Sequence, residues 1–129
     1  MELKHLGKTG SQPIEYMEGF PAPEGIGTVS LETHELECYC PVTKQPDIYR
    51  CVIEYVPYDT CVETKSLKMY LWHFREEAQF AEALACKIAS DFVRDIKPAR
   101  VSVTLTQNVR GGIQLTAVSK LNMLGERSV

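Results

Sequence analysis

The sequence lacks any apolar run approaching the ~20 residues that a transmembrane helix needs, and it does not open with a basic segment followed by an apolar stretch. We therefore expect a soluble, cytoplasmic protein. An excess of positive charge is also missing, because 14 Lys and Arg stand against 17 Asp and Glu, for a net charge of −3. Since nucleic-acid-binding surfaces are usually basic, this balance argues against a nucleic-acid partner.

A complete disulfide framework within one chain is excluded as well, because there are five cysteines. Unpaired thiols fit the reducing cytoplasm. Cys38 and Cys40 are separated by one residue, whereas paired zinc ligands usually have two to four residues between them. His34, His73 and Cys61 are the further ligands that a zinc site would have to recruit. The spacing therefore predicts no metal site.

What is present is ordinary globular composition in 129 residues, 44% hydrophobic and 24% charged, which predicts one domain over residues 1–129. Glycine and proline punctuate residues 1–27 too densely for a regular element, and residues 120–129 are predicted to be a tail. A domain of this size buries only about two-thirds of its unfolded surface. Because little room is left for an active site formed within one chain, we expect a site at a subunit boundary.

Alternating apolar and polar residues predict four strands, at residues 29–37, 48–56, 100–106 and 113–118. Two helices are predicted between the second and third strands, at residues 66–75 and 77–96. The second has an apolar stripe of residues four apart: Phe80, Leu84, Ile88, Phe92 and Ile96. This order predicts an α+β fold, a four-stranded antiparallel sheet with two helices on one face.

Three groups of residues are candidates for chemistry. Cys40 and Asp47 share a proline-bounded loop and suit a thiolate nucleophile with a nearby acid; the alternative is a buried cysteine beside an ordinary turn aspartate. Lys65 and Lys68 lie at the start of the first helix, capped by Thr64 or Ser66, and suit a phosphate, as does the hairpin loop at residues 110–112. Glu82 points away from the apolar stripe and is either a ligand-facing carboxylate or a surface residue.

Two blocks resemble the QueF family, the nitrile reductases of queuosine biosynthesis. One is Cys-Pro-Val-Thr-Lys-Gln-Pro-Asp at residues 40–47, and the other is Val-Glu-Thr-Lys-Ser-Leu-Lys-Met-Tyr at residues 62–70. The similarity runs from about residue 31 to residue 116. It implies the T-fold, in which four-stranded sheets of several subunits join into a ring, such as a decamer, with active sites between subunits.

The resemblance also implies a reaction, the reduction of 7-cyano-7-deazaguanine to 7-aminomethyl-7-deazaguanine with two NADPH. Cys40 would form a covalent thioimide with the nitrile, and Asp47 would donate protons. The implied substrate-binding residues are Val62, Glu63, Thr64, Ala81 and Glu82, with Glu63 coming from across a subunit boundary. The implied cofactor-binding residues are Thr64, Lys65, Arg110 and Gly111.

One position departs from the family pattern, because Ala81 stands where the family usually has a histidine that contacts substrate and handles protons. His73, on the first predicted helix, is the alternative residue for that role, although nothing in the sequence places it at the site. The departure keeps two alternatives open. One is an amidine-forming transferase that adds ammonia to the same thioimide on tRNA, as archaeosine synthases of this type do. The other is a non-catalytic T-fold protein that binds a pterin or deazaguanine base.

Overall fold

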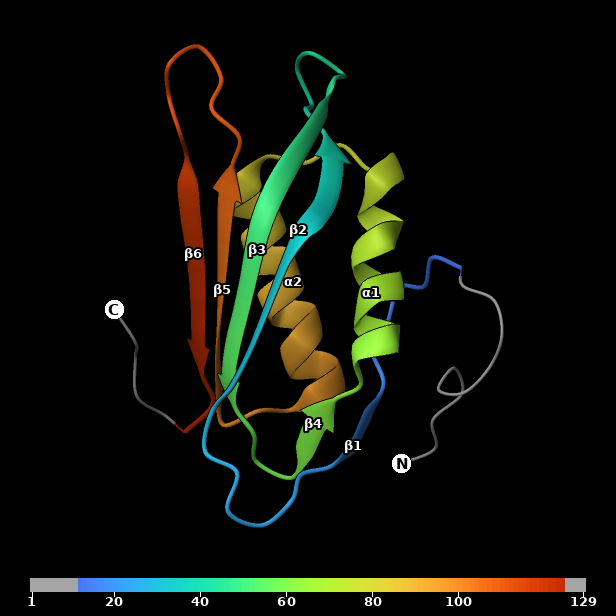
Figure 1. Ribbon diagram of the computed structural model, residues 1–129, viewed down its shortest axis with the longest axis vertical. Helices are drawn as coiled ribbons and strands as arrows, with labels where there is room; N and C mark the ends of the chain where they lie inside the picture. The colour runs from blue at the N-terminus through green and yellow to red at the C-terminus, as the bar shows by residue number, and fades with distance from the viewer. Residues whose placement is uncertain (1–11, 125–129) are drawn as a thin grey trace.

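The computed structural model describes residues 12–124, and its main element is one antiparallel sheet (Figure 1). The sheet has the order β2 (Val29–Tyr39), β3 (Pro46–Val56), β5 (Arg100–Gln107) and β6 (Thr116–Asn122). Helices α1 (Thr64–Trp72) and α2 (Ala81–Ile96) pack on the same face, with the short 3-10 helix η1 (His73–Glu76) after α1. The predicted α+β arrangement is confirmed. Within residues 12–124, no helix is both long enough and apolar enough to span a bilayer.

The core lies between the sheet and the two helices, because strand side chains alternate between the faces. On β3 the inward residues Tyr49, Cys51, Ile53 and Tyr55 are each 1% exposed. They meet the α2 stripe, where the Tyr55 and Phe92 ring centroids are 4.8 Å apart. Each such side chain contributes about 1.5–3 kcal/mol when fully buried. Phe80 does not belong to the stripe as predicted, because it precedes the helix and is 54% exposed.

The last strand lies further along the chain than predicted. Residues 113–118 were expected to pair, but β6 begins at Thr116 and continues to Asn122, opposite Arg100. The reason is the turn before it: Arg110 and Ile113 exchange backbone hydrogen bonds of 3.0 Å, so Ile113 closes the loop and is 72% exposed. Of the predicted tail, residues 120–122 belong to β6, and residues 125–129 lie outside the described part of the chain.

Both helices begin elsewhere than predicted. Glu63 caps α1 in place of Thr64 or Ser66, because its carboxylate accepts hydrogen bonds from the backbone N–H groups of Lys65 and Ser66. The regular helix ends at Trp72, and η1 completes the segment. The predicted start of the second helix at residue 77 is wrong, because residues 77–79 run beside the end of β2 and α2 begins at Ala81.

Two short strands were missed because three residues carry too little periodicity to detect. β1 (Gly19–Pro21) pairs antiparallel with β4 (Thr60–Val62), so the segment predicted to be irregular up to residue 27 contains a strand. Gly19 is required there, since a β-carbon would lie 2.8 Å from the carbonyl oxygen of Cys61. The pairing fixes the chain just before α1. Residues 1–11 lie outside the described part.

Candidate active site

Cys40 lies in a closed loop between β2 and β3. Its backbone N–H donates to the carbonyl of Gln45 (2.9 Å), and its carbonyl accepts from the N–H of Lys44 (3.0 Å). Lys44 adopts a left-handed conformation with φ of 61°, which allows this tight return. Asp47 then enters β3 directly opposite Cys38, so the loop brings the carboxylate to the end of the strand that leads to Cys40.

The thiols of Cys38 and Cys40 have pKa values that are shifted in opposite directions. Hydrogen bonds from the backbone N–H and hydroxyl of Thr43, together with the N–H of Val42, lower the pKa of the Cys40 thiol. Burial instead raises the pKa of Cys38, which lies 3.5 Å from the carbonyl oxygen of Gln79. Because the thiolate is the nucleophilic form, Cys40 is the reactive partner of the two.

Asp47 is buried, with 4% of its surface exposed, and faces Arg110. The Nε atom of Arg110 lies 3.1 Å from Oδ1 of Asp47, and its Nη2 donates to the carbonyl of Pro46 at 2.9 Å. Within residues 12–124, Oδ1 makes this ion pair but accepts no hydrogen bond. Gly111 and Gly112 have φ values of 58° and 78°, which glycine adopts readily and which turn the hairpin. The arginine expected to contact the cofactor therefore also holds the expected proton donor.

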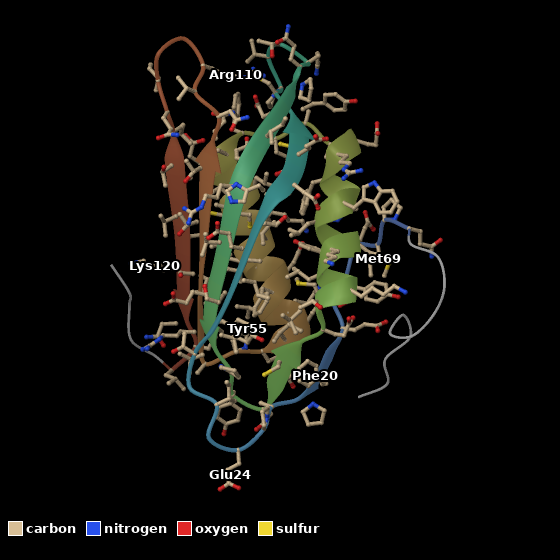
Figure 2. The ribbon with its side chains drawn as sticks, viewed as in Figure 1. Phe20, Glu24, Tyr55, Met69, Arg110 and Lys120 are labelled. Atoms are coloured by element: carbon tan, nitrogen blue, oxygen red, sulfur yellow. The ribbon has the colours of Figure 1, made fainter. Side chains whose placement is uncertain are left out.

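Backbone hydrogen bonds hold the segment before α2 against the end of β2, next to the Cys40 loop. The N–H of Tyr39 donates to Glu77 (2.8 Å), and the N–H of Gln79 donates back to Tyr39 (3.0 Å). Ala81 and Glu82 follow directly; Ala81 is buried and Glu82 is exposed. Arg110 marks this end in Figure 2, at the upper edge of the sheet. The fold thus gathers Cys40, Asp47, Glu82 and Arg110 at one end; we call this group the nucleophile end.

His73 is engaged elsewhere. Its Nδ1 pairs with the carbonyl of Tyr70, and its Nε2 lies 3.2 Å from the carboxylate of Glu77. Its ring also packs on Phe74, with centroids 4.0 Å apart. Both ring nitrogens therefore have partners within its own helical segment and the residues that follow. The structure gives no support to the alternative that His73 takes the role of the histidine missing at Ala81.

The second predicted block lies at the opposite end, where α1 begins. Val62 and Glu63 are buried, Lys65 is half-buried and Thr64 is exposed. Phe20, labelled near the lower end in Figure 2, pairs with Cys61 and so marks this position. We call the group Val62, Glu63, Thr64 and Lys65 the signature end. Thr64 also lines a cavity of about 250 Å³ between β2 and α1, together with Lys68 and Arg75.

The two ends are separated by the length of a strand. β3 has 11 residues and runs from the nucleophile end to the turn before β4. At about 3.3 Å per residue, it spans roughly 35 Å. One chain therefore does not bring Cys40 and Glu63 together.

A buried hydrogen-bond network that sequence reasoning missed supports the signature end. The carboxylate of Asp91 accepts from the hydroxyl of Tyr70 (2.6 Å), and Asp95 accepts from the N–H of Met17 (2.8 Å). The backbone carbonyl of Glu18, the residue after Met17, accepts from the N–H of Glu63 (2.8 Å). The residues come from distant parts of the chain, so periodicity gave no signal for them. The network ties the N-terminal segment to α2 and to the start of α1.

Potential metal ligands do not cluster. Among residues 12–124, no three His, Cys, Asp or Glu side chains lie close enough together to hold an ion. Cys38 instead approaches the Tyr49 hydroxyl (3.9 Å) and the Gln79 carbonyl.

The sheet order and the helix placement define a T-fold protein. A solved structure of an archaeosine synthase, QueF-Like, in its apo form superposes with a TM-score of 0.71. The match covers 75% of this chain and 95% of that chain, at 23% sequence identity. At this identity the likeness establishes the fold alone.

Sequence relatives narrow the class to one family. Residues 46–123 match the family model described as QueF-like protein. The relative from Nitrosococcus oceani is 40% identical over 117 residues, covering 89% of this chain and 91% of its own. The relative from Frankia casuarinae is 40% identical over 119 residues, covering 92% and 95%. Both are named NADPH-dependent 7-cyano-7-deazaguanine reductase. This chain belongs to the QueF family.

Proposed function

We propose that this protein is an NADPH-dependent 7-cyano-7-deazaguanine reductase, acting in queuosine biosynthesis in the cytoplasm. The observation that carries the proposal is the closed loop after β2, which favours the thiolate of Cys40 and leads to the buried carboxylate of Asp47 opposite Cys38. The names of relatives at about 40% identity supply the substrate and the cofactor.

In this proposal Cys40 attacks the nitrile carbon. A carbon–sulfur bond forms, one π bond of the nitrile breaks, and its nitrogen takes a proton to give a thioimide. Asp47 relays that proton: its carboxylate, oriented by the Arg110 guanidinium 3.1 Å away, takes the proton of the Cys40 thiol as the thiolate forms and passes it to the nitrile nitrogen. NADPH, when bound, supplies two hydrides, one from each of two molecules. Covalent attachment to Cys40 would hold the substrate between the two reductions. The nitrogen would take its further protons by way of Asp47, and the carbon–sulfur bond would break with the electron pair leaving on the Cys40 thiolate.

Recognition of the base falls to Glu82 at the start of α2. Its exposed carboxylate offers two oxygens to the adjacent N–H donors of a guanine-like edge. Ala81 beside it carries no group that exchanges protons, so in this proposal Asp47 performs proton delivery without help from position 81. That requirement makes Asp47 a sensitive target for mutation.

In this proposal a second copy of the chain supplies the rest of the substrate pocket and the cofactor-binding residues Thr64 and Lys65. Val62, Glu63, Thr64 and Lys65 lie roughly 35 Å from the nucleophile end, the length of β3 at about 3.3 Å per residue. A neighbouring subunit in a ring would bring its signature end to the Cys40 of this one. Arg110 and Gly111, already at the nucleophile end, would contact the cofactor from the first subunit.

The test combines two measurements on wild type and Cys40→Ala. We expect the wild type to oxidise two NADPH per 7-cyano-7-deazaguanine, and without NADPH to gain the mass of one nitrile ligand. Cys40→Ala should lose both while keeping its circular dichroism spectrum. Cys86→Ala, which removes an exposed thiol from α2, is the matched control.

Other outcomes separate the alternatives. An adduct that takes up ammonia without NADPH would indicate that the protein is an amidine-forming transferase and not a reductase. Stoichiometric binding of the base with no mass gain would indicate a non-catalytic binder, an alternative that Ala81 keeps open. An adduct that survives in Cys40→Ala would overturn the assignment of the nucleophile.

A further inference from the structure

Ser66 lies in the first turn of α1 and is completely buried, with 0% of its surface exposed. Its hydroxyl oxygen accepts a hydrogen bond from the backbone N–H of Glu18 at 2.9 Å. The same oxygen lies 2.8 Å from the carbonyl oxygen of Glu63 and 3.3 Å from that of Glu18. A hydroxyl has one hydrogen to donate, and the shorter distance favours donation to Glu63. The side chain therefore joins two parts of the chain that are 48 positions apart.

The segment that Ser66 contacts is itself held on two sides. The N–H of Glu63 donates to the carbonyl of Glu18 (2.8 Å), so Glu18 meets the start of α1 through both of its backbone groups. One residue earlier, the N–H of Met17 donates to the carboxylate of Asp95 on α2 (2.8 Å). The Ser66 hydroxyl thus connects the first turn of α1 to a segment that is anchored on α2.

Loss of this hydroxyl would act on the residues beside it. The N–H of Glu18 would lose its acceptor inside the protein, and a buried backbone donor without a partner is costly enough that the surrounding chain moves to satisfy it. The part that would move is the first turn of α1, which carries Thr64 and Lys65. Ser66 can therefore affect a ligand at these two residues although it is too deeply buried to touch one.

We propose that Ser66 is a positioning residue for the cofactor. Its hydroxyl holds the first turn of α1 against residues 17–18, so that Thr64 and Lys65 keep the placement that NADPH requires. This inference rests on the proposed function, which assigns those two residues to the cofactor. It goes beyond that function by naming a buried residue that acts through them.

The test compares NADPH binding and hydrogen exchange in the full-length protein. We expect Ser66→Ala to raise the Kd for NADPH, measured by fluorescence titration, by about tenfold, the effect of one misplaced hydrogen bond to a charged ligand. At saturating NADPH its kcat should stay within about twofold of wild type, because the nucleophile end is unchanged. Without ligand, exchange read by mass spectrometry on residues 14–20 should show that the Glu18 amide has lost its protection.

Two further variants separate the hydroxyl from the general effect of mutation. Ser66→Thr keeps a hydroxyl that can bond to the same carbonyl within a helix, and it should restore both the affinity and the protection. Ser119→Ala removes a buried side chain hydroxyl from β6, so it is the matched control and should change neither. Circular dichroism would show that each variant is folded.

Three results would overturn the proposal. The first is a Glu18 amide that stays protected in Ser66→Ala, and the second is a Ser66→Ala protein that binds NADPH as tightly as wild type. The third is a Ser66→Thr protein that keeps the protection yet binds as weakly as Ser66→Ala. Equal affinity in wild type and Ser66→Ala would reject the positioning role alone, whereas a wild type that binds no NADPH would reject the reductase and the positioning role together.

Discussion

At the residue scale, the nucleophile end depends on two charged groups that secure each other. Asp47 is 4% exposed, and burial of a carboxylate is costly unless a partner compensates it. Arg110 provides that partner at 3.1 Å from a hairpin loop 63 positions later in the chain. The loop at residues 110–112 therefore has two expected tasks, to hold the acid and to meet the cofactor.

Replacement of Asp47 tests proton delivery directly. We expect Asp47→Asn to slow turnover by about 10²–10⁴-fold, the usual contribution of general acid catalysis, because the amide keeps the shape but has no acidic proton. Steady-state kinetics should show the loss in kcat, while fluorescence titration shows that binding of the base persists. Asp59→Asn, on the turn before β4, serves as the control. Turnover within a few-fold of wild type in Asp47→Asn would mean that another group delivers the proton.

At the element scale, interactions of neighbouring residues with the helix backbone determine where each helix begins and ends. Glu63 caps α1 with a side chain that was expected to face substrate, and its carboxylate is already occupied by two backbone N–H groups. α2 ends at Ile96, and Lys97 caps it. The φ of 52° and ψ of 55° at Lys97 place a residue with a β-carbon in the left-handed region. That conformation costs about 1–2 kcal/mol in a residue other than glycine.

Relief of that strain gives a stability prediction away from the site. We expect Lys97→Gly to raise the free energy of unfolding by up to about 1 kcal/mol, because glycine avoids the β-carbon clash but loses more chain entropy on folding. Urea denaturation would measure the change. Lys97→Ala removes the same charge and keeps the β-carbon, so it should give no such gain. Equal stabilisation by both variants would assign the effect to charge.

At the scale of the whole molecule, the long strands separate the two parts of the proposed site. The nucleophile end closes the sheet at one end, and the signature end lies beside β1 and β4 at the other (Figure 1). The network of Asp91, Asp95 and Glu18 holds the signature end rigidly on its own chain. In the proposed reductase, an intact site would therefore require a second copy of the chain, which would supply the signature end that the first copy holds too far from Cys40.

Mixing two inactive variants tests this division. Cys40→Ala and Glu63→Ala should each lack activity, yet co-refolded in equal amounts they should regain about a quarter of wild-type sites, since random assembly joins the two intact parts that often. Glu63→Ala also removes a helix cap, at a cost of about 0.5–2 kcal/mol. Its unfolding curve must therefore be recorded beside the activity.

The control is a mixture in which both variants carry their change at the nucleophile end, Cys40→Ala with Asp47→Asn. That mixture should stay at the sum of its parts, because each site takes both residues from one chain. If the first mixture also stayed inactive, Cys40 and Glu63 would have to act within one subunit. The fold described here would then have to change on binding.

The sequence by itself determined the fold class and indicated the candidate residues for the proposed chemistry. Alternation in β3 and β5 and the stripe on α2 depend on periods of two and about four residues, which are local properties that burial then obeys. Tertiary structure decided what local patterns do not contain. The pairing of β1 with β4 and the ion pair of Asp47 with Arg110 join residues distant in sequence. The later start of β6 depends on the hydrogen bonds that close the turn between Arg110 and Ile113. Tertiary structure also decided the separation of Cys40 from Glu63, because the direction and length of β3 place the two blocks at opposite ends of the sheet.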